Sequence, residues 1–328
     1  MKTIRCLSAL LVACATPLAS AQTVDPFYAG VYSITNLGSV AGVPTNNGGL
    51  TFKAGDPNTI LLGGSANNSA GLFYSVPVIR GAGNHIVALG AVTALGFGTN
   101  NDGGVAYGPG GVLFYSEYSI NNVGEVKPAS ASDSKTVALG PLGIPVSTGA
   151  LNFVPPGYNG AGEFKVSSWS GGEFYTVTLA ADGLGTFDLT GATLEVTLPG
   201  GPEGFAYVPL GSQLFPSQSM VVSEYSNNTV ATYKIDGNGN PVLASRQTFI
   251  AGLNGAEGAA IDPLTGDFFF STYGSSNQVI EVRGFAPPAP PTAIAPVPTL
   301  SMPGIAAATL LVLLTGLLPA LRRRSRRA

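Results

Sequence analysis

Short alternations of apolar and polar residues run through the middle of the chain and predict β-strands. One pattern, small residues followed by alternating apolar ones, recurs every 46 to 55 residues. Its copies end at the following residues: Phe52, Tyr107, Phe153, Tyr207 and Ile261. Each copy is followed by a turn rich in Pro, Gly and Asp, then by two apolar runs joined by a polar turn. A further run leads into the next copy, so each repeat predicts four short strands with tight turns.

Repeats of this length with four strands are typical of the blades of a β-propeller. Five copies predict five blades, and six blades would need a further copy. The fifth copy stops one strand short, near residue 285, and the stretch GVYSITNLGSV before the first copy supplies strands that would complete it. Closure would remove unpaired strand edges. We therefore predict an all-β, five-bladed propeller over residues 22–285.

Residues 1–21, the signal segment, have the pattern of a secretory signal peptide. Lys2 and Arg5 precede an apolar run, and Ala19-Ser20-Ala21 matches an A-x-A cleavage site. An alternative is lipoprotein processing at Cys14, because Leu11-Val12-Ala13-Cys14 is similar to a lipobox. Either route predicts export.

The C-terminal segment predicts a membrane anchor. Residues 286–299 form a Pro-rich linker, residues 300–321 an uncharged span, and residues 322–328 an Arg-rich tail. Within this span, the apolar run from Ile305 to Leu321 would cover roughly 25 Å as a helix, enough for a bilayer core. Since positive residues stay on the cytoplasmic side, the propeller is expected to face the periplasm.

The same segment carries a resemblance to a family of sorting signals. Val297-Pro298-Thr299-Leu300, an apolar helix and an arginine cluster together resemble the IPTL-type C-terminal signal, a relative of the PEP-CTERM signals of Gram-negative bacteria. The resemblance implies cleavage by an exosortase-type protease, followed by release or attachment at the cell surface. The chain departs from the family at Val297, usually Ile, and at Pro303, where Trp usually precedes the Gly. A plain tail anchor is the alternative.

Composition excludes several kinds of chemistry. The two cysteines, Cys6 and Cys14, lie in the signal segment, so thiol catalysis and Cys-ligated metals are not expected. His85 is the only histidine, and we expect it in a solvated turn. Residues 22–285 hold 18 acidic and 8 basic residues, a formal net charge of −10. Such a surface disfavours nucleic acid as a partner.

Carboxylates recur at equivalent places of the repeats, where propeller loops share one face. We therefore expect five acids around one mouth of the channel: Asp102, Glu117, Glu203, Glu224 and Glu257. Oxygen ligands of this kind suit Ca²⁺, which would be the cofactor if one is bound. The alternative is that the acids cap turns, face solvent and hold no metal.

Aromatic residues follow the same register in four repeats. They are Tyr118, Trp169, Tyr225 and Tyr273. Such side chains could form a rim on which sugars stack, or they could wedge between blades. Both alternatives stay open at the level of sequence.

The repeat layout, notably the stretch EGAAIDPLTGDFFFSTYGSSNQVIEVRGF, resembles propellers of the NHL and SMP-30/gluconolactonase-like group. The resemblance implies a carboxylate–asparagine metal site at the mouth. Two functions follow. A surface-displayed propeller could bind a polysaccharide or matrix component, which the absence of a catalytic motif favours. A metal-dependent lactonase or lyase could instead use the residues Glu117, Glu203, Glu224 and Glu257. Fold alone does not choose between them.

Overall fold

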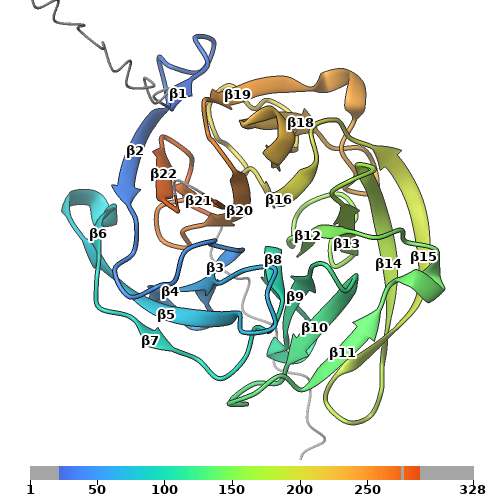
Figure 1. Ribbon diagram of the computed structural model, residues 1–328. Helices are drawn as coiled ribbons and strands as arrows, with labels where there is room; N and C mark the ends of the chain where they lie inside the picture. Colours follow the sequence, from blue (N-terminus) through green and yellow to red (C-terminus); the bar gives the residue numbers. More distant parts are fainter. Residues whose placement is uncertain (1–21, 275–276, 289–328) are drawn as a thin grey trace, which may run out of the picture. The chain divides into compact units, whose positions relative to one another are not determined.

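The computed structural model describes residues 22–274 and 277–288, which fold into five antiparallel sheets arranged radially (Figure 1). The innermost strands of the sheets are β3 (Leu50–Lys53), β8 (Asn101–Tyr107), β12 (Thr148–Phe153), β16 (Pro202–Tyr207) and β20 (Ala256–Ile261). These five strands contain the five copies of the sequence pattern. The prediction of an all-β propeller with five blades is confirmed.

Each blade continues outward from its inner strand through three further main strands. Blade 1 adds β4 (Asp56–Gly64), β5 (Leu72–Arg80) and β6 (Ile86–Leu89), with β7 (Thr93–Ala94) paired to β5. Blade 2 adds β9 (Leu113–Glu117), β10 (Asn122–Val126) and β11 (Lys135–Ala138). Blade 3 adds β13 (Phe164–Ser168), β14 (Glu173–Ala181) and β15 (Phe187–Thr197).

Blades 4 and 5 include strands from residues 22–40, which we call the N-terminal segment. Blade 4 adds β17 (Ser219–Glu224), β18 (Thr229–Lys234), β19 (Gln247–Ala251) and, outermost, β1 (Thr23–Val24). Blade 5 adds β21 (Phe268–Thr272), β22 (Val279–Arg283) and β2 (Ser33–Gly38). Short 3-10 turns lie at Ala82–Asn84, Pro109–Gly111, Gly140–Leu142, Tyr225–Asn227 and Leu243–Ser245.

Strand β2 closes the ring, as the sequence predicts. It pairs antiparallel with β22, with Ser33 opposite Arg283 and Thr35 opposite Glu281. The preceding strand β1 pairs with β19, which the repeat pattern does not reveal. The N-terminal segment therefore contributes to two adjacent blades, 4 and 5. Its strand β2 supplies the fourth strand of blade 5 and covers the outer edge of β22.

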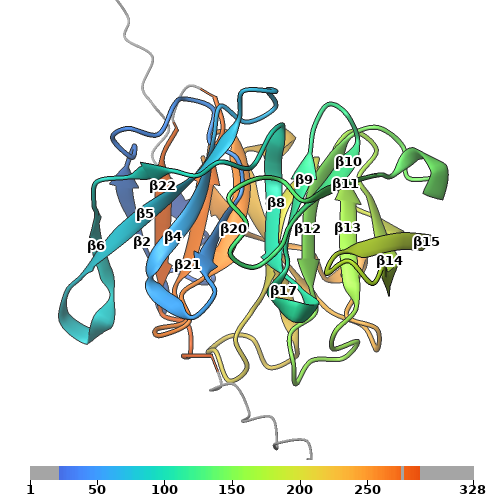
Figure 2. The same ribbon diagram turned by 90° about the horizontal axis from the view of Figure 1, so that it is seen from below.

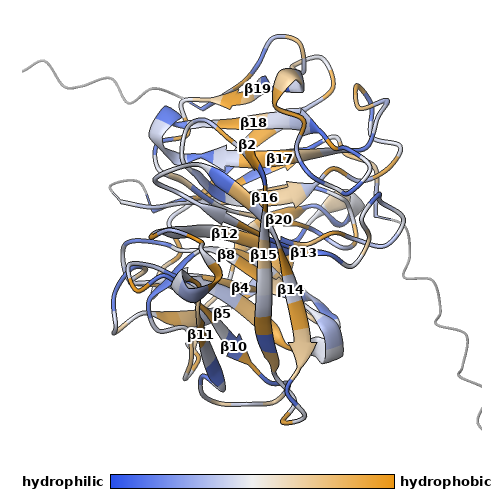
Figure 3. Ribbon diagram, turned by 90° about the vertical axis from the view of Figure 1, so that its right-hand side faces the viewer, coloured by the Kyte–Doolittle hydropathy of each residue, from blue (hydrophilic) through white to orange (hydrophobic). Residues whose placement is uncertain are grey.

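The hydrophobic core is divided among the interfaces between blades. Five clusters of buried residues each combine side chains from two neighbouring blades. Between blades 1 and 2, for example, Phe73 packs edge-to-face on Tyr115 with ring centroids 5.5 Å apart. Hydrophobic stretches lie along strands such as β14 and β19, whereas the loops are mixed in character (Figure 3). Since both faces of most blades are covered, many strands are apolar at successive positions.

The strands run between two loop-bearing faces of the ring (Figure 2). Inner strands approach each other closely, and glycine permits this. A Cβ built on Gly103 would lie 1.9 Å from the backbone oxygen of Glu203, and one on Gly258 would lie 2.7 Å from the Cα of Gly49. The small residues of the repeat pattern are therefore required by backbone contacts at the centre of the ring.

Among the described residues, none of the helices has the length and apolar character needed to cross a bilayer. The predicted signal peptide, the sorting motif, the apolar span and the Arg-rich tail lie outside the described residues, as does nearly all of the linker.

Candidate functional site

Three of the predicted acids meet at the centre of the ring. Asp102 comes from β8, Glu203 from β16 and Glu257 from β20, and one carboxylate oxygen of each lies within 4.8 Å of the others. Their side chains are buried, with exposures of 1%, 6% and 1%. We call these residues the acid cluster. The alternative that they cap turns and face solvent is wrong for all three.

Local backbone geometry places these side chains. Each acid stands at the start of its strand, directly before a glycine, where the pairing with the second strand of the blade shifts register. Such irregularities re-aim side chains at strand ends. The glycines allow the strands to approach, because a Cβ on Gly204 would lie 2.2 Å from the backbone oxygen of Glu257. The acid–glycine order thus brings carboxylates from different blades together.

Burial makes the ionised forms of the acid cluster unfavourable. It raises the pKa of Asp102 to about 7, although hydrogen bonds from neighbours oppose the shift. Burial is also the main cause that raises the pKa of Glu203 and of Glu257 well above the usual range. The negative charge of Asp102 adds to the shift of Glu203, and the negative charges of Glu203 and Asp102 add to that of Glu257. Among the described residues, one oxygen of each acid has no hydrogen-bond partner. Near neutral pH the cluster must therefore retain protons or bind a cation.

The other two predicted acids lie elsewhere. Glu117 accepts hydrogen bonds from Tyr115 Oη at 3.0 Å and from Thr136 Oγ1 at 3.3 Å, within blade 2. Glu224 accepts hydrogen bonds from Arg246 Nε at 2.8 Å and Tyr233 Oη at 2.7 Å, within blade 4.

Burial would raise the pKa of Glu224, but these partners outweigh burial and lower it. The expectation of five acids around one mouth is therefore wrong for Glu117 and Glu224, because both side chains turn toward the outer strands of their own blades and bond there.

The four predicted aromatic residues contact one another in sequence. Ring centroids are 6.3 Å apart for Tyr118 and Trp169, 6.1 Å for Trp169 and Tyr225, and 6.2 Å for Tyr225 and Tyr273, all edge-to-face. All four are half-buried. We call them the aromatic arc; it runs from blade 2 to blade 5, and each contact joins neighbouring blades.

The aromatic arc lies beside the acid cluster. Burial raises the pKa of Tyr225, and the nearby charges of Glu257, Glu203 and Asp102 add to the shift. Burial likewise raises the pKa of Tyr273, with a further contribution from Glu257. The site thus combines half-buried rings with buried carboxylates close to them.

A second ionic cluster, which the sequence did not reveal, lies between blades 1 and 5. His85 Nδ1 lies 2.5 Å from Asp267 Oδ2, and the His85 side chain is 34% exposed, so the prediction of a solvated turn residue holds only in part. Nearby, Arg80 donates to both oxygens of Asp262, at 2.6 and 3.1 Å. These partners are 182 residues apart in the chain, so no local pattern could have paired them.

These features define the class of the protein: a five-bladed β-propeller with a buried acid cluster at its centre. No family model matches the chain, and no curated protein matches its sequence. Some solved structures do match the chain over much of its length.

A glutaminyl cyclase from Myxococcus xanthus is 16% identical, with a TM-score of 0.45, covering 77% of this chain and 96% of that one. A protein provisionally described as a gluconolactonase is 14% identical, with a TM-score of 0.44 and coverage of 82% and 100%. Virginiamycin B lyase from Staphylococcus aureus is 9% identical, with a TM-score of 0.37 and coverage of 77% and 99%. Similarity at this level concerns the fold alone.

Proposed function

We propose that this protein is a surface-displayed β-propeller that binds its ligand at the central face, with a divalent cation held by the acid cluster. One observation carries the proposal: three buried carboxylates from three blades converge and keep oxygens that lack a partner among the described residues. Unpaired buried carboxylates are costly unless a proton or a cation neutralises them.

The residues present fit Ca²⁺ better than a softer metal. All three donors are carboxylate oxygens, and the Oδ1 atom of Asn67, whose side chain hydrogen-bonds to Asp102, also lacks a partner among the described residues. Hard oxygen ligands suit Ca²⁺, whereas Zn²⁺ is usually held by nitrogen or sulfur. Asp102, Glu203 and Glu257 would hold the cation, with Asn67 as a fourth oxygen donor. The cation would supply positive charge for oxygen atoms of a ligand.

The aromatic arc supports binding at the same face. Its rings are half-exposed and span four of the five blades. Aromatic faces of this kind offer apolar contact area at little conformational cost. A ligand held there would contact the rings while its oxygen atoms approach the cation. A polysaccharide or another matrix component has both kinds of surface.

A metal-dependent lactonase or lyase is the alternative function. One observation favours it: Asp102, with a pKa of about 7, could exchange a proton near neutral pH. Only Glu203 and Glu257 of its four predicted acids remain as candidates, because Glu117 and Glu224 are engaged within their blades.

Calcium titration calorimetry at about pH 8 tests the proposal. The parent protein should bind about one Ca²⁺ per chain, and the double variant Glu203→Gln, Glu257→Gln should lose this binding, because neutral amides cannot replace two charged ligands. The same preparations should show no turnover on a panel of lactones. Equal Ca²⁺ binding by parent and variant would reject the cation site. Lactone turnover that the variant lacks would favour the enzyme.

Export and sorting form the second part of the proposal. The signal segment, the motif Val297–Leu300, the apolar span and the arginine cluster support a precursor that is anchored in the inner membrane, faces the periplasm and is cleaved by an exosortase-type protease. The product would be released or attached at the cell surface. This order of steps requires the propeller to fold outside the cytoplasm.

Replacing Pro298 and Thr299 with alanine should prevent this processing. The intact mass of the cell-associated protein should then include the C-terminal arginines, whereas the parent should lose them. Thr292→Ala, in the linker before the motif, is the matched control and should be processed normally. If the parent itself retains its arginines, the segment is a plain tail anchor.

A further inference from the structure

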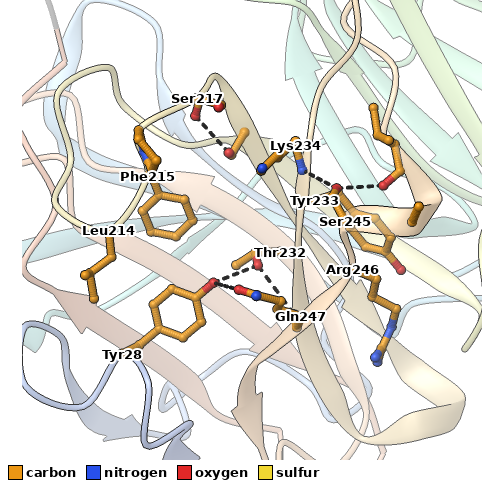
Figure 4. A pocket seen from close by; sticks show the side chains of 14 residues that line it. Tyr28, Leu214, Phe215, Ser217, Thr232, Tyr233, Lys234, Ser245, Arg246 and Gln247 are labelled. Atoms are coloured by element: carbon orange, nitrogen blue, oxygen red, sulfur yellow. Dashed lines mark hydrogen bonds between the residues drawn. The ribbon is translucent and has the colours of Figure 1, made fainter.

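A cavity of about 450 Å³ lies on blade 4 (Figure 4), and no residue of the acid cluster lines it. Its lining residues come from the end of β18, from residues 214–217 and Ser219 up to the start of β17, from residues 242 and 244–247 up to the start of β19, and from Tyr28 of the N-terminal segment. A volume of this size is typical of sites for small ligands. The N-terminal segment thus helps to build a site as well as to close the ring.

One wall of the cavity is aromatic and held in place. The rings of Tyr28 and Phe215 are stacked, with centroids 5.6 Å apart and an angle of 18° between planes. Tyr28 Oη donates to Gln247 Oε1 at 2.9 Å and lies 3.0 Å from Thr232 Oγ1 (Figure 4). These bonds fix Tyr28, and the half-buried Phe215 packs against it. The result is a preformed flat surface beside polar groups.

The charge of the cavity is opposite to that of the body. Its 14 lining residues include Lys234 and Arg246 but no Asp or Glu, whereas residues 22–285 together carry −10. Arg246 uses Nε and one terminal nitrogen for Glu224. The exposed Lys234 donates from its backbone to Ser245 Oγ, and no described residue engages its ammonium group. This lining therefore favours a ligand that carries an anionic group.

We propose that this cavity binds an acidic saccharide, a sugar unit that bears a carboxylate. The apolar face of the sugar ring would lie on Phe215, and the hydroxyl group of Ser217 and the side-chain amide of Gln247 would meet the sugar hydroxyls. The Lys234 ammonium would pair with the carboxylate, as charge-assisted hydrogen bonds are stronger than neutral ones. The inference names a ligand class for a site separate from the acid cluster, and it does not require a cation there.

Calorimetry with two probes tests this inference on the exported chain. Short oligogalacturonates should bind, and neutral galacto-oligomers of equal length should bind at least about tenfold more weakly, since they lack the charged partner. Lys234→Gln should weaken oligogalacturonate binding by about tenfold without unfolding the protein, because the side chain is exposed. Phe215→Ala should also weaken binding. Lys127→Gln, at an exposed lysine on blade 2, is the matched control and should change nothing.

Three results would overturn the inference. The first is equal binding of the acidic and the neutral oligomers. The second is an effect of Lys127→Gln as large as that of Lys234→Gln, which would mean nonspecific attraction. The third is loss of oligogalacturonate binding in the Glu203→Gln, Glu257→Gln variant, which would assign the saccharide to the central face. Retained saccharide binding in that variant, together with lost Ca²⁺ binding, would separate the two sites.

Discussion

Raising the pH from about 5 to about 8 in the presence of EDTA should lower the melting temperature of the parent protein. The acids of the acid cluster have raised pKa values in the folded state, about 7 for Asp102 and well above the ordinary glutamate value for Glu203 and Glu257. Between the ordinary carboxyl pKa of about 4 and these values, the folded state binds more protons than the unfolded state. The free energy of unfolding must therefore fall as the pH rises through this window.

The expected loss from Asp102 alone is on the order of 2–4 kcal/mol, because its pKa of about 7 lies about three pH units above the ordinary value and each unit corresponds to about 1.4 kcal/mol. Ca²⁺ should reverse the loss at about pH 8, since the cation neutralises the same carboxylates. At a free concentration of about a thousand times its Kd, the cation would add about 4 kcal/mol. Scanning calorimetry with EDTA or with Ca²⁺ at each pH measures both effects.

The double variant Glu203→Gln, Glu257→Gln separates this explanation from a general effect of pH. Its amides mimic the protonated acids, so its melting temperature in EDTA should vary less with pH and should not respond to Ca²⁺. Asp25→Asn, at a half-buried carboxylate that accepts a hydrogen bond from the backbone nitrogen of Phe27, is the control and should keep the pH dependence of the parent. An unchanged slope in the double variant would show that the acid cluster is not the titrating group.

Gly103→Ala should destabilise the protein by about 3 kcal/mol or more, which would lower the melting temperature by roughly 10 °C. The added Cβ would lie 1.9 Å from the backbone oxygen of Glu203. The obstacle is the backbone of another inner strand, so no side-chain rotation can relieve the contact. Blades 2 and 4 would have to move apart, and contacts within the ring would be lost.

Gly191→Ala is the matched control, because Gly191 also lies in a strand, β15. The nearest atom to its Cβ would be Thr178 Oγ1 at 3.7 Å, an ordinary van der Waals contact. Its effect on the free energy of unfolding should stay below about 1 kcal/mol. If the two variants melt at the same temperature, the close approach of the inner strands does not limit stability.

The sequence predicted the blades well because a blade is a local unit. Its four strands follow one another along the chain, and tight turns between them leave little choice of pairing. The closing strand was predictable for a similar reason: the fifth repeat lacks one strand, and the segment at residues 30–40 offers one. The extra strand β1 was missed because two residues, Thr23 and Val24, carry no periodic pattern.

The candidate site was only partly predictable. The repeat register placed five acids near strand ends, but it does not distinguish acids on the innermost strand of a blade from acids at the end of the second strand. The acids on inner strands face acids from other blades, whereas Glu117 and Glu224 end second strands and turn toward partners such as Arg246. The direction of a side chain at a strand end depends on register shifts and on the neighbouring strand. Neither is visible in the repeat itself.

From the sequence alone came the number of blades, the closure of the ring, the glycines of the inner strands and the acidic character of the body, because each follows from local periodicity and composition. Tertiary structure alone decided which carboxylates meet and that His85 pairs with Asp267. It also decided that Tyr28 joins Phe215 in a cavity whose lining includes the basic side chains of Lys234 and Arg246. Those contacts join residues that are tens to hundreds of positions apart. They exist only because a ring brings remote strands and loops to a common place.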